Sequence, residues 1–215
     1  MPELVPIPNP GVPDQYGEPG APLVVLIHDW YGRLPWLKFY AEGLAHQGFR
    51  VVVPDLYDGV ATDNANDAEA LMENLDVAAA LSEIDDVVQL ARAEGSERVG
   101  LVGFSMGGWL ALLHAQSGVA DAVAAYYATL GATQHGVIPS PVQLHFAEID
   151  EWDEGQDPES FIDLLKDHGT PVTEYNYPGT VHSFANATIG NSVDVDAAAL
   201  AFTRTANFLQ KHLVD

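Results

Sequence analysis

A serine in a glycine-rich turn is the residue of this sequence whose surroundings best fit a catalytic role. Residues 103–108 read GFSMGG, follow the apolar run 99–103 and precede a run of good helix formers. A G-x-S-x-G segment between a buried strand and a helix places its serine on a sharp, strained turn, which requires small residues two positions before and after. Gly103 and Gly107 meet this requirement. Ser105 is therefore a candidate nucleophile.

A serine hydroxyl is a weak nucleophile, so it needs a general base and an acid that orients the base. Where this turn occurs, the chain order is serine, acid, histidine. Asp150 directly follows a predicted strand, and His182 lies in the loop after the last predicted strand. Asp153 and Asp157 are alternative acids, but only Asp150 comes directly after a strand end. We expect His182 to be the base and Asp150 to be the acid.

The predicted turn also directs the N-terminus of the next helix at the reacting centre. Its N–H groups and dipole favour a developing oxyanion. Met106 directly follows the serine, so its backbone N–H is predicted to be one donor of an oxyanion hole.

Strand-like and helix-like patterns alternate along most of the chain. Prolines are concentrated in residues 1–22, which are predicted to form an extended arm with at most a short edge strand at 4–7. Asp76 is a potential N-cap that would divide the longest helical segment. Strands are predicted at residues 23–28, 50–54, 98–102, 120–126, 142–146 and 173–177, and helices at 34–47, 67–94, 105–116, 158–168 and 196–213.

This order of elements predicts an α/β fold with a mainly parallel, doubly wound sheet flanked by helices. A chain of 215 residues fits one such domain, here residues 23–215. The connection at 127–141 is short, which leaves no room for a large cap domain. The site is expected beyond the carboxyl ends of the strands.

The charge balance is strongly acidic, with 31 Asp and Glu against 8 Lys and Arg and a formal net charge of −23. Nucleic acids and anionic membranes are therefore not expected partners, because phosphate attraction has the wrong sign. The acidic residues are spread along the chain. This favours a protein from a saline environment, where salt screens self-repulsion, over an ordinary acidic protein.

The sequence has no cysteine, so it forms neither a disulfide nor a thiolate metal site. The acidic clusters at 85–86 and 150–157 lack the spaced His and carboxylate sets of zinc or calcium sites. The first residues lack a signal-peptide pattern, and the apolar runs are too short to span a bilayer. We expect a cytoplasmic enzyme, monomeric or weakly dimeric, without a cofactor or metal.

Five stretches together resemble the dienelactone hydrolase family, in the family order. The resemblance implies an α/β-hydrolase fold without a large cap, which acts on esters or lactones without a cofactor. It assigns Ser105, Asp150 and His182 to a catalytic triad and makes the N–H of Trp30 the second oxyanion donor. The stretches are residues 27–32 (IHDWYG), 53–57 (VPDLY), 103–108 (GFSMGG), 145–150 (HFAEID) and 177–184 (YPGTVHSF).

The departures from the family pattern bear on the substrate. The usual nucleophile of the family is cysteine, and Ser105 takes its place here. Asp29 stands where cysteine members have glutamate, and Gly59 and Asn186 stand where members that act on the dienelactone carboxylate have arginines. Without these cations, an anionic substrate has little to attract it. A small neutral ester or lactone is therefore predicted, cleaved through an acyl-enzyme.

Six residues near these motifs are expected to line the substrate pocket. Three other functions remain open: a dienelactone (carboxymethylenebutenolide) hydrolase proper, a non-hydrolytic binding protein on the same fold, and an acyltransferase. The expected pocket residues are Asp29, Tyr31, Tyr57, Trp152, Phe184 and Asn186.

Overall fold

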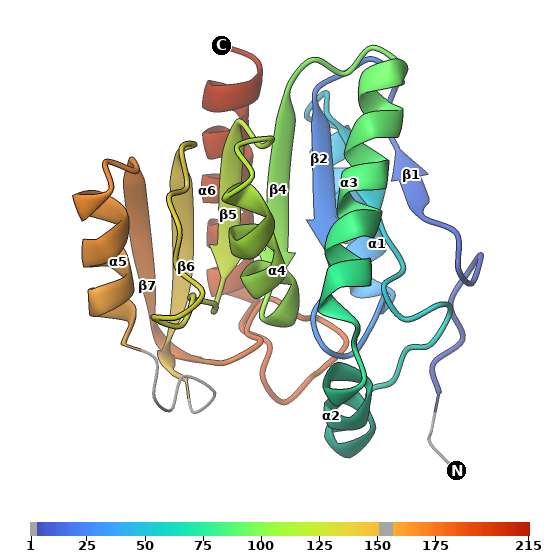
Figure 1. Cartoon of the computed structure of the whole chain (residues 1–215). Helices are drawn as coiled ribbons and strands as arrows, with labels where there is room; N and C mark the ends of the chain where they lie inside the picture. Colours follow the sequence, from blue (N-terminus) through green and yellow to red (C-terminus); the bar gives the residue numbers. More distant parts are fainter. Residues whose placement is uncertain (1–3, 151–156) are drawn as a thin grey trace.

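A sheet with helices on both faces forms the centre of the protein in the computed structural model, which describes residues 4–150 and 157–215 (Figure 1). Within these residues the sheet has seven strands in the order β1-β3-β2-β4-β5-β6-β7. All neighbours pair in parallel except β1, which is antiparallel to β3. The predicted mainly parallel sheet is confirmed. The strands are β1 (Asp14–Tyr16), β2 (Leu23–Ile27), β3 (Arg50–Val53), β4 (Val99–Phe104), β5 (Ala122–Tyr126), β6 (Val142–Ile149) and β7 (Val172–Val181).

The sequence predicts at most a short edge strand at residues 4–7. Only a single bridge forms there, between Leu4 and Thr62, because prolines around this segment supply no N–H to a ladder. The edge strand is instead β1, whose residues Asp14, Gln15 and Tyr16 pair with β3. The sheet therefore includes part of the segment predicted to be an extended arm.

The helices form two layers (Figure 1). The helices α1 (Trp36–Ala45) and α6 (Val195–Leu213) cover one face of the sheet, and α3 (Val77–Ala93), α4 (Met106–Ala115) and α5 (Pro158–Asp167) cover the other. The short α2 (Ala65–Glu73) lies beyond the end at which the parallel strands finish.

The predicted division of the longest helical segment is confirmed. Asp76 is the N-cap of α3, and its Oδ1 accepts a hydrogen bond of 3.1 Å from the N–H of Ala79. A side-chain oxygen at this position satisfies an N–H group that the helix itself leaves without a partner. The chain therefore starts a new helix here, which leaves α2 as a separate element at the end of the sheet.

A buried chain of polar side chains runs through the core beneath β5, β6 and β7. The Tyr40 hydroxyl lies 3.0 Å from that of Tyr126, which lies 2.7 Å from Oγ1 of Thr205. His145 continues the chain, with Nε2 3.0 Å from Thr205 Oγ1 and Nδ1 2.7 Å from the Tyr177 hydroxyl. Its ring stacks on Tyr126 with centroids 4.2 Å apart. Burial lowers the pKa of His145 to about 3, so the ring is neutral at ordinary pH.

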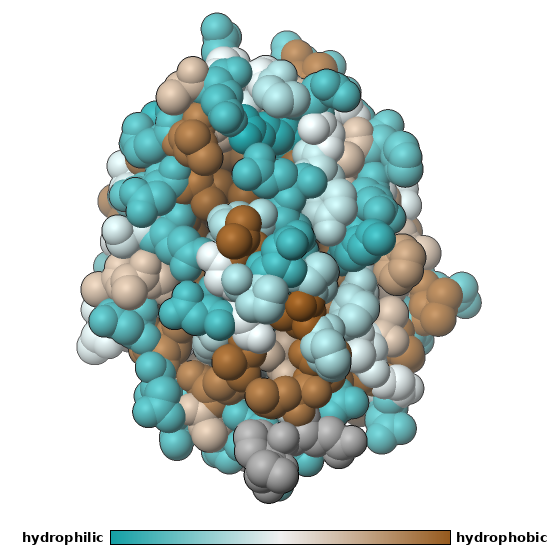
Figure 2. Space-filling model, turned by 90° about the vertical axis from the view of Figure 1, so that its right-hand side faces the viewer, coloured by the Kyte–Doolittle hydropathy of each residue, from teal (hydrophilic) through white to brown (hydrophobic). Residues whose placement is uncertain are grey.

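The surface on the side of the N-terminal segment is mostly hydrophilic. Figure 2 shows polar side chains over most of this face, with apolar side chains gathered towards the end at which the parallel strands finish. No helix in residues 4–150 and 157–215 is long and apolar enough to cross a membrane.

The two fully buried histidines, His28 and His145, predict an acid-sensitive fold. Burial lowers their pKa values to about 4 and about 3, whereas an unfolded histidine titrates near pH 6.5. Their contribution to stability is complete above about pH 6.5 and falls by about 1.4 kcal/mol per pH unit for each ring as pH drops towards the folded pKa values. The buried Asp29 partly opposes this, because its pKa is raised to about 6.

The variant His145→Gln tests this prediction. Urea unfolding of the variant should show a shallower loss of unfolding free energy between about pH 6.5 and about pH 4, by about 1.4 kcal/mol per pH unit. The exposed His46 gives a matched control, because His46→Gln should keep the slope of the unchanged protein. Equal slopes in all three proteins would contradict the prediction.

Candidate active site

The turn between β4 and α4 holds Ser105 in a strained backbone conformation. Ser105 has φ 51° and ψ −116°, in the region of positive φ that residues other than glycine rarely adopt. Its N–H donates to the carbonyl of Tyr126 at 2.9 Å, and its own carbonyl accepts the N–H of Trp109 at 2.9 Å. The turn is thereby fixed to the end of β5 and to the first turn of α4.

The glycines of the turn are required by close backbone contacts. A Cβ on Gly103 would overlap the carbonyl group of Gly107 and lie 2.6 Å from the N of Gly108. A Cβ on Gly107 would overlap the carbonyl oxygens of Ile27 and His28. The absence of side chains lets β2, β4 and α4 meet directly at the turn.

The pairing of β6 with β7 brings the predicted acid beside the predicted base. The register shifts by a bulge between Ala147 and Ile149, and Ile149 then pairs with Val181. Asp150 and His182 each follow one member of this last pair, and the N–H of His182 donates to the Ile149 carbonyl at 3.2 Å. Residues from two strand ends therefore lie side by side.

Ser105, His182 and Asp150 form a continuous hydrogen-bonded chain. Ser105 Oγ lies 2.8 Å from Nε2 of His182, and Nδ1 of His182 lies 2.7 and 2.8 Å from the two carboxylate oxygens of Asp150. The side chains of His182 and Asp150 are 13% and 10% exposed. In this geometry His182 Nδ1–H donates to the carboxylate, which leaves Nε2 as the acceptor that faces the serine hydroxyl.

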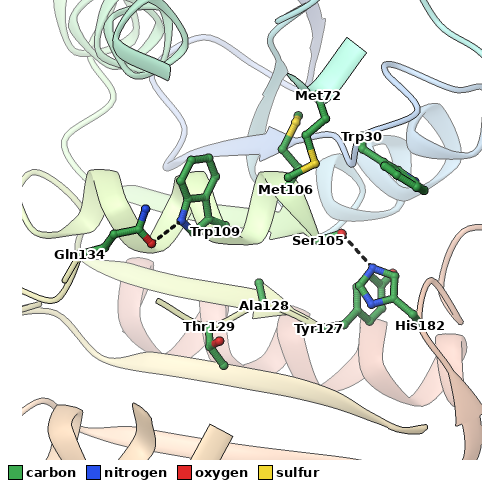
Figure 3. A pocket seen from close by; sticks show the side chains of 10 residues that line it. All are labelled: Trp30, Met72, Ser105, Met106, Trp109, Tyr127, Ala128, Thr129, Gln134 and His182. Carbon is green, nitrogen blue, oxygen red and sulfur yellow. Dashed lines mark hydrogen bonds between the residues drawn. The ribbon is translucent and has the colours of Figure 1, made fainter. Parts of the chain in front are cut away.

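A cavity of about 310 Å³ opens above this chain (Figure 3). Its wall combines apolar and aromatic side chains with a few polar groups, as small-molecule sites do. The lining residues are Trp30, Met72, Ser105, Met106, Trp109, Tyr127, Ala128, Thr129, Gln134 and His182.

The two predicted oxyanion donors, Trp30 and Met106, both lie at this cavity. Met106 is the first residue of α4, where the helix leaves N–H groups without intrahelical partners. Trp30 lies in the loop that follows β2, and its side chain is 7% exposed. Figure 3 shows Trp30 and Met106 on either side of Ser105.

The five described residues among those expected to line the pocket do not line this cavity. All five are buried, between 0% and 9% exposed, and none of them is among the lining residues. They are Asp29, Tyr31, Tyr57, Phe184 and Asn186; the sixth, Trp152, lies outside the described residues.

One of these residues, Tyr57, supports the wall of the cavity together with His28. The hydroxyl of Tyr57 donates to Sδ of Met106 at 3.1 Å, and its ring packs 5.1 Å from that of His28. His28 has a structural role: its Nδ1 lies 2.7 Å from the carbonyl of Asp29, and its Nε2 accepts from the N–H of Leu56 at 3.2 Å. Tyr57 and His28 therefore both fix loops next to the site.

Several residues that line the cavity were not predicted from the sequence. Trp109 had a signal, since it lies four residues after Ser105 and one helical turn brings both to one face of α4. Its Nε1–H donates to Oε1 of Gln134 at 3.0 Å. Gln134 and Met72 come from a loop and from α2, and nothing in their local sequence points to the site.

Of the two alternative acids, Asp157 lies in the part of the chain that the structure describes. Asp157 is the N-cap of α5 and accepts the N–H of Glu159, so it serves the helix. Asp153 lies outside the described residues. In residues 4–150 and 157–215, no group of three or more His, Asp or Glu side chains is arranged to hold a metal ion.

Comparison with known proteins decides the family. The profile of the dienelactone hydrolase family matches residues 12–213. The chain belongs to the dienelactone hydrolase family. It is thus a hydrolase with an α/β-hydrolase fold, as its motifs predicted.

Known relatives of this member of the dienelactone hydrolase family align with it over most of their own length. It is 28% identical over 208 residues to Protein usf of Aquifex pyrophilus, covering 90% of each chain. It is 29% identical over 209 residues to the carboxymethylenebutenolidase of Pseudomonas putida, covering 88% of this chain and 85% of the relative. A dienelactone hydrolase-like promiscuous phosphotriesterase from metagenomic libraries has a similar fold, with TM-score 0.78, 20% identity and coverage of 89% and 86%.

The close contacts at the β4–α4 turn predict that one added methyl group strongly lowers the stability of the fold. Gly103→Ala should lower the free energy of unfolding by about 2–3 kcal/mol, because the new Cβ overlaps the Gly107 carbonyl. Gly190→Ala is the matched control: nothing lies within 4 Å of its Cβ position, so the change should stay within about 0.5 kcal/mol. Chemical unfolding measures both, and equal stability of the two variants would contradict the packing described here.

Proposed function

We propose that this member of the dienelactone hydrolase family is a serine hydrolase that cleaves small neutral carboxylic esters or lactones through an acyl-enzyme. The observation that carries the proposal is the chain from Ser105 Oγ to His182 Nε2 and from His182 Nδ1 to Asp150, set at the base of the cavity. Since the sequence contains no cysteine, the thiol that is usual in the family is not available, and the hydroxyl of Ser105 is proposed to act in its place.

In the proposed mechanism, His182 takes the proton of the Ser105 hydroxyl as its oxygen attacks the substrate carbonyl. Asp150 keeps the imidazole in the tautomer that accepts at Nε2 and stabilises the imidazolium that forms. His182 then returns the proton to the leaving alkoxide. Water, deprotonated by the same nitrogen, hydrolyses the acyl-enzyme and regenerates Ser105.

The developing oxyanion is proposed to bind the backbone N–H groups of Met106 and Trp30. Met106 lies at the N-terminus of α4, whose dipole favours negative charge. Trp30 reaches the cavity from the loop after β2. Preorganised donors of this kind each contribute about a hundredfold to a thousandfold in rate.

The lining of the cavity supports a neutral substrate. Its polar members are Ser105, Thr129, Gln134 and His182, and none of the described lining residues is Lys or Arg. Asn186, which replaces one arginine of the family, is fully buried and does not face the cavity. A carboxylate on the substrate would therefore lose its hydration without gaining a cationic partner.

Removal of the Ser105 hydroxyl tests the nucleophile. Ser105→Ala should lower kcat for an acetate ester by about a thousandfold or more and should abolish covalent labelling by a fluorophosphonate. The exposed Ser117 provides the control, because Ser117→Ala should keep both properties. Turnover by Ser105→Ala close to that of the unchanged enzyme would refute the serine mechanism, and a labelled protein that turns over no ester would favour an acyltransferase.

Substrate charge gives a second test. The kcat/KM for a neutral phenyl acetate should exceed that for the anionic dienelactone by about tenfold or more, since the cavity offers no cation. Gln134→Lys, which adds a cation to the wall, should narrow the difference, whereas Gln134→Asn should leave it unchanged. Faster turnover of the anion by the unchanged enzyme would favour a dienelactone hydrolase proper.

A further inference from the structure

Asp29 and Asn186 form a buried hydrogen-bonded pair behind the cavity. Both side chains are 0% exposed, and Nδ2 of Asn186 donates to Oδ2 of Asp29 at 2.7 Å. Neither residue lines the cavity. The pair is therefore not placed to touch a substrate.

Each member of the pair also holds the turn of its own loop. Oδ1 of Asp29 accepts the N–H of Tyr31 at 3.0 Å. Oδ1 of Asn186 accepts the N–H groups of Thr188 at 3.0 Å and Ile189 at 3.3 Å. Both oxygens of Asp29 and both polar atoms of Asn186 thus have partners, and the bond between the two side chains joins two loops far apart in the sequence.

The two joined loops carry groups on opposite sides of the proposed reacting carbonyl. Asp29 and Tyr31 flank Trp30, which lies in the cavity wall. Asn186 follows His182 by four residues, and its N–H donates to the carbonyl of Ser183 at 2.8 Å. The bond between Asp29 and Asn186 therefore connects the loop of Trp30 to the loop that follows His182.

We propose that the Asp29–Asn186 hydrogen bond is a positioning link, which sets the Trp30 loop at the distance from His182 that ester hydrolysis requires. The inference rests on the proposed function of Ser105, His182 and Trp30. Acyl transfer needs the base and the oxyanion donors at fixed positions relative to the reacting carbonyl. A displacement of one of these groups by about 1 Å lowers the rate by about a hundredfold. Asp29 and Asn186 act through other residues and are positioning residues.

The link can act through its hydrogen bonds or through the charge of Asp29. That carboxylate is close enough to His182 to interact with it electrostatically, and burial raises its pKa to about 6. An exchange of the two side chains separates these roles. In the double variant Asp29→Asn, Asn186→Asp, the amide at 29 donates to the carboxylate at 186. The three bonds from backbone N–H groups keep their donors and acceptors, the bond between the side chains is kept with its direction reversed, and the charge moves to the other loop.

The single variants break the link in two ways. Asp29→Asn sets two amide donors against each other, because Oδ1 of Asn186 is held by Thr188 and Ile189. Asn186→Asp sets two buried carboxylates against each other, which is strongly unfavourable. Each single variant should lower kcat for phenyl acetate by about tenfold to a hundredfold with a smaller change in KM. The double variant should recover to within about threefold of the unchanged enzyme.

Two further measurements keep the outcomes distinct. Asp76→Asn, an exchange at the exposed N-cap of α3, is the control and should not change kcat. Fluorophosphonate labelling of the unchanged enzyme at Ser105 tests the proposed function separately, so failure of the link leaves that result intact. If the single variants do not fold, the kcat of the folded double variant still tests whether the reaction needs the bond or the charge at position 29.

Unchanged kcat in the single variants, or a folded double variant more than about tenfold slower than the unchanged enzyme, would overturn the link. The second result would show that the charge at position 29, rather than the bond, is what the reaction needs. Recovery of kcat in the double variant supports the link. If the pair had only a structural role, the exchange would restore the melting temperature without restoring kcat.

Discussion

Close contact between backbone segments at the β4–α4 turn is the constraint on which the rest of the site depends. Gly103 and Gly107 leave room for the chain to reverse directly against the carbonyls at the end of β2. This contact holds Ser105 in its strained conformation and starts α4 along the face of the sheet that it covers. The same contact fixes where the loop after β2 lies, and therefore where Trp30 can reach the cavity.

The other half of the site depends on the pairing of two strand ends. The register shift between β6 and β7 and the final pair Ile149–Val181 bring Asp150 beside His182. Parallel strands all finish at one edge of the sheet, so groups from β2, β4, β6 and β7 meet there without a cap domain. Compared with the usual cysteine-based pattern of the family, the chain combines the proposed hydroxyl nucleophile with a cavity that has no described Lys or Arg in its lining.

The parts that could be predicted from sequence are those with strong local signals. The glycines around Ser105, the N-cap at Asp76 and the continuous apolar runs each determine structure within a few residues. The cavity wall could not be predicted, because Met72 and Gln134 reach it from segments whose own sequence contains no relevant pattern. Asp29 and Asn186 were assigned to the pocket from motif positions, but their partners, which are set by tertiary packing, place them behind it.

The anchoring of the nucleophile turn to Tyr126 has a consequence for inactivation by heat. The carbonyl of Tyr126 holds the N–H of Ser105, while its hydroxyl belongs to the buried polar chain that reaches Thr205 on α6. The turn is thus fastened, through one residue, to the helix layer on the opposite face. Loosening the turn that holds Ser105 requires the core to open, so loss of activity and global melting should coincide as a single cooperative event.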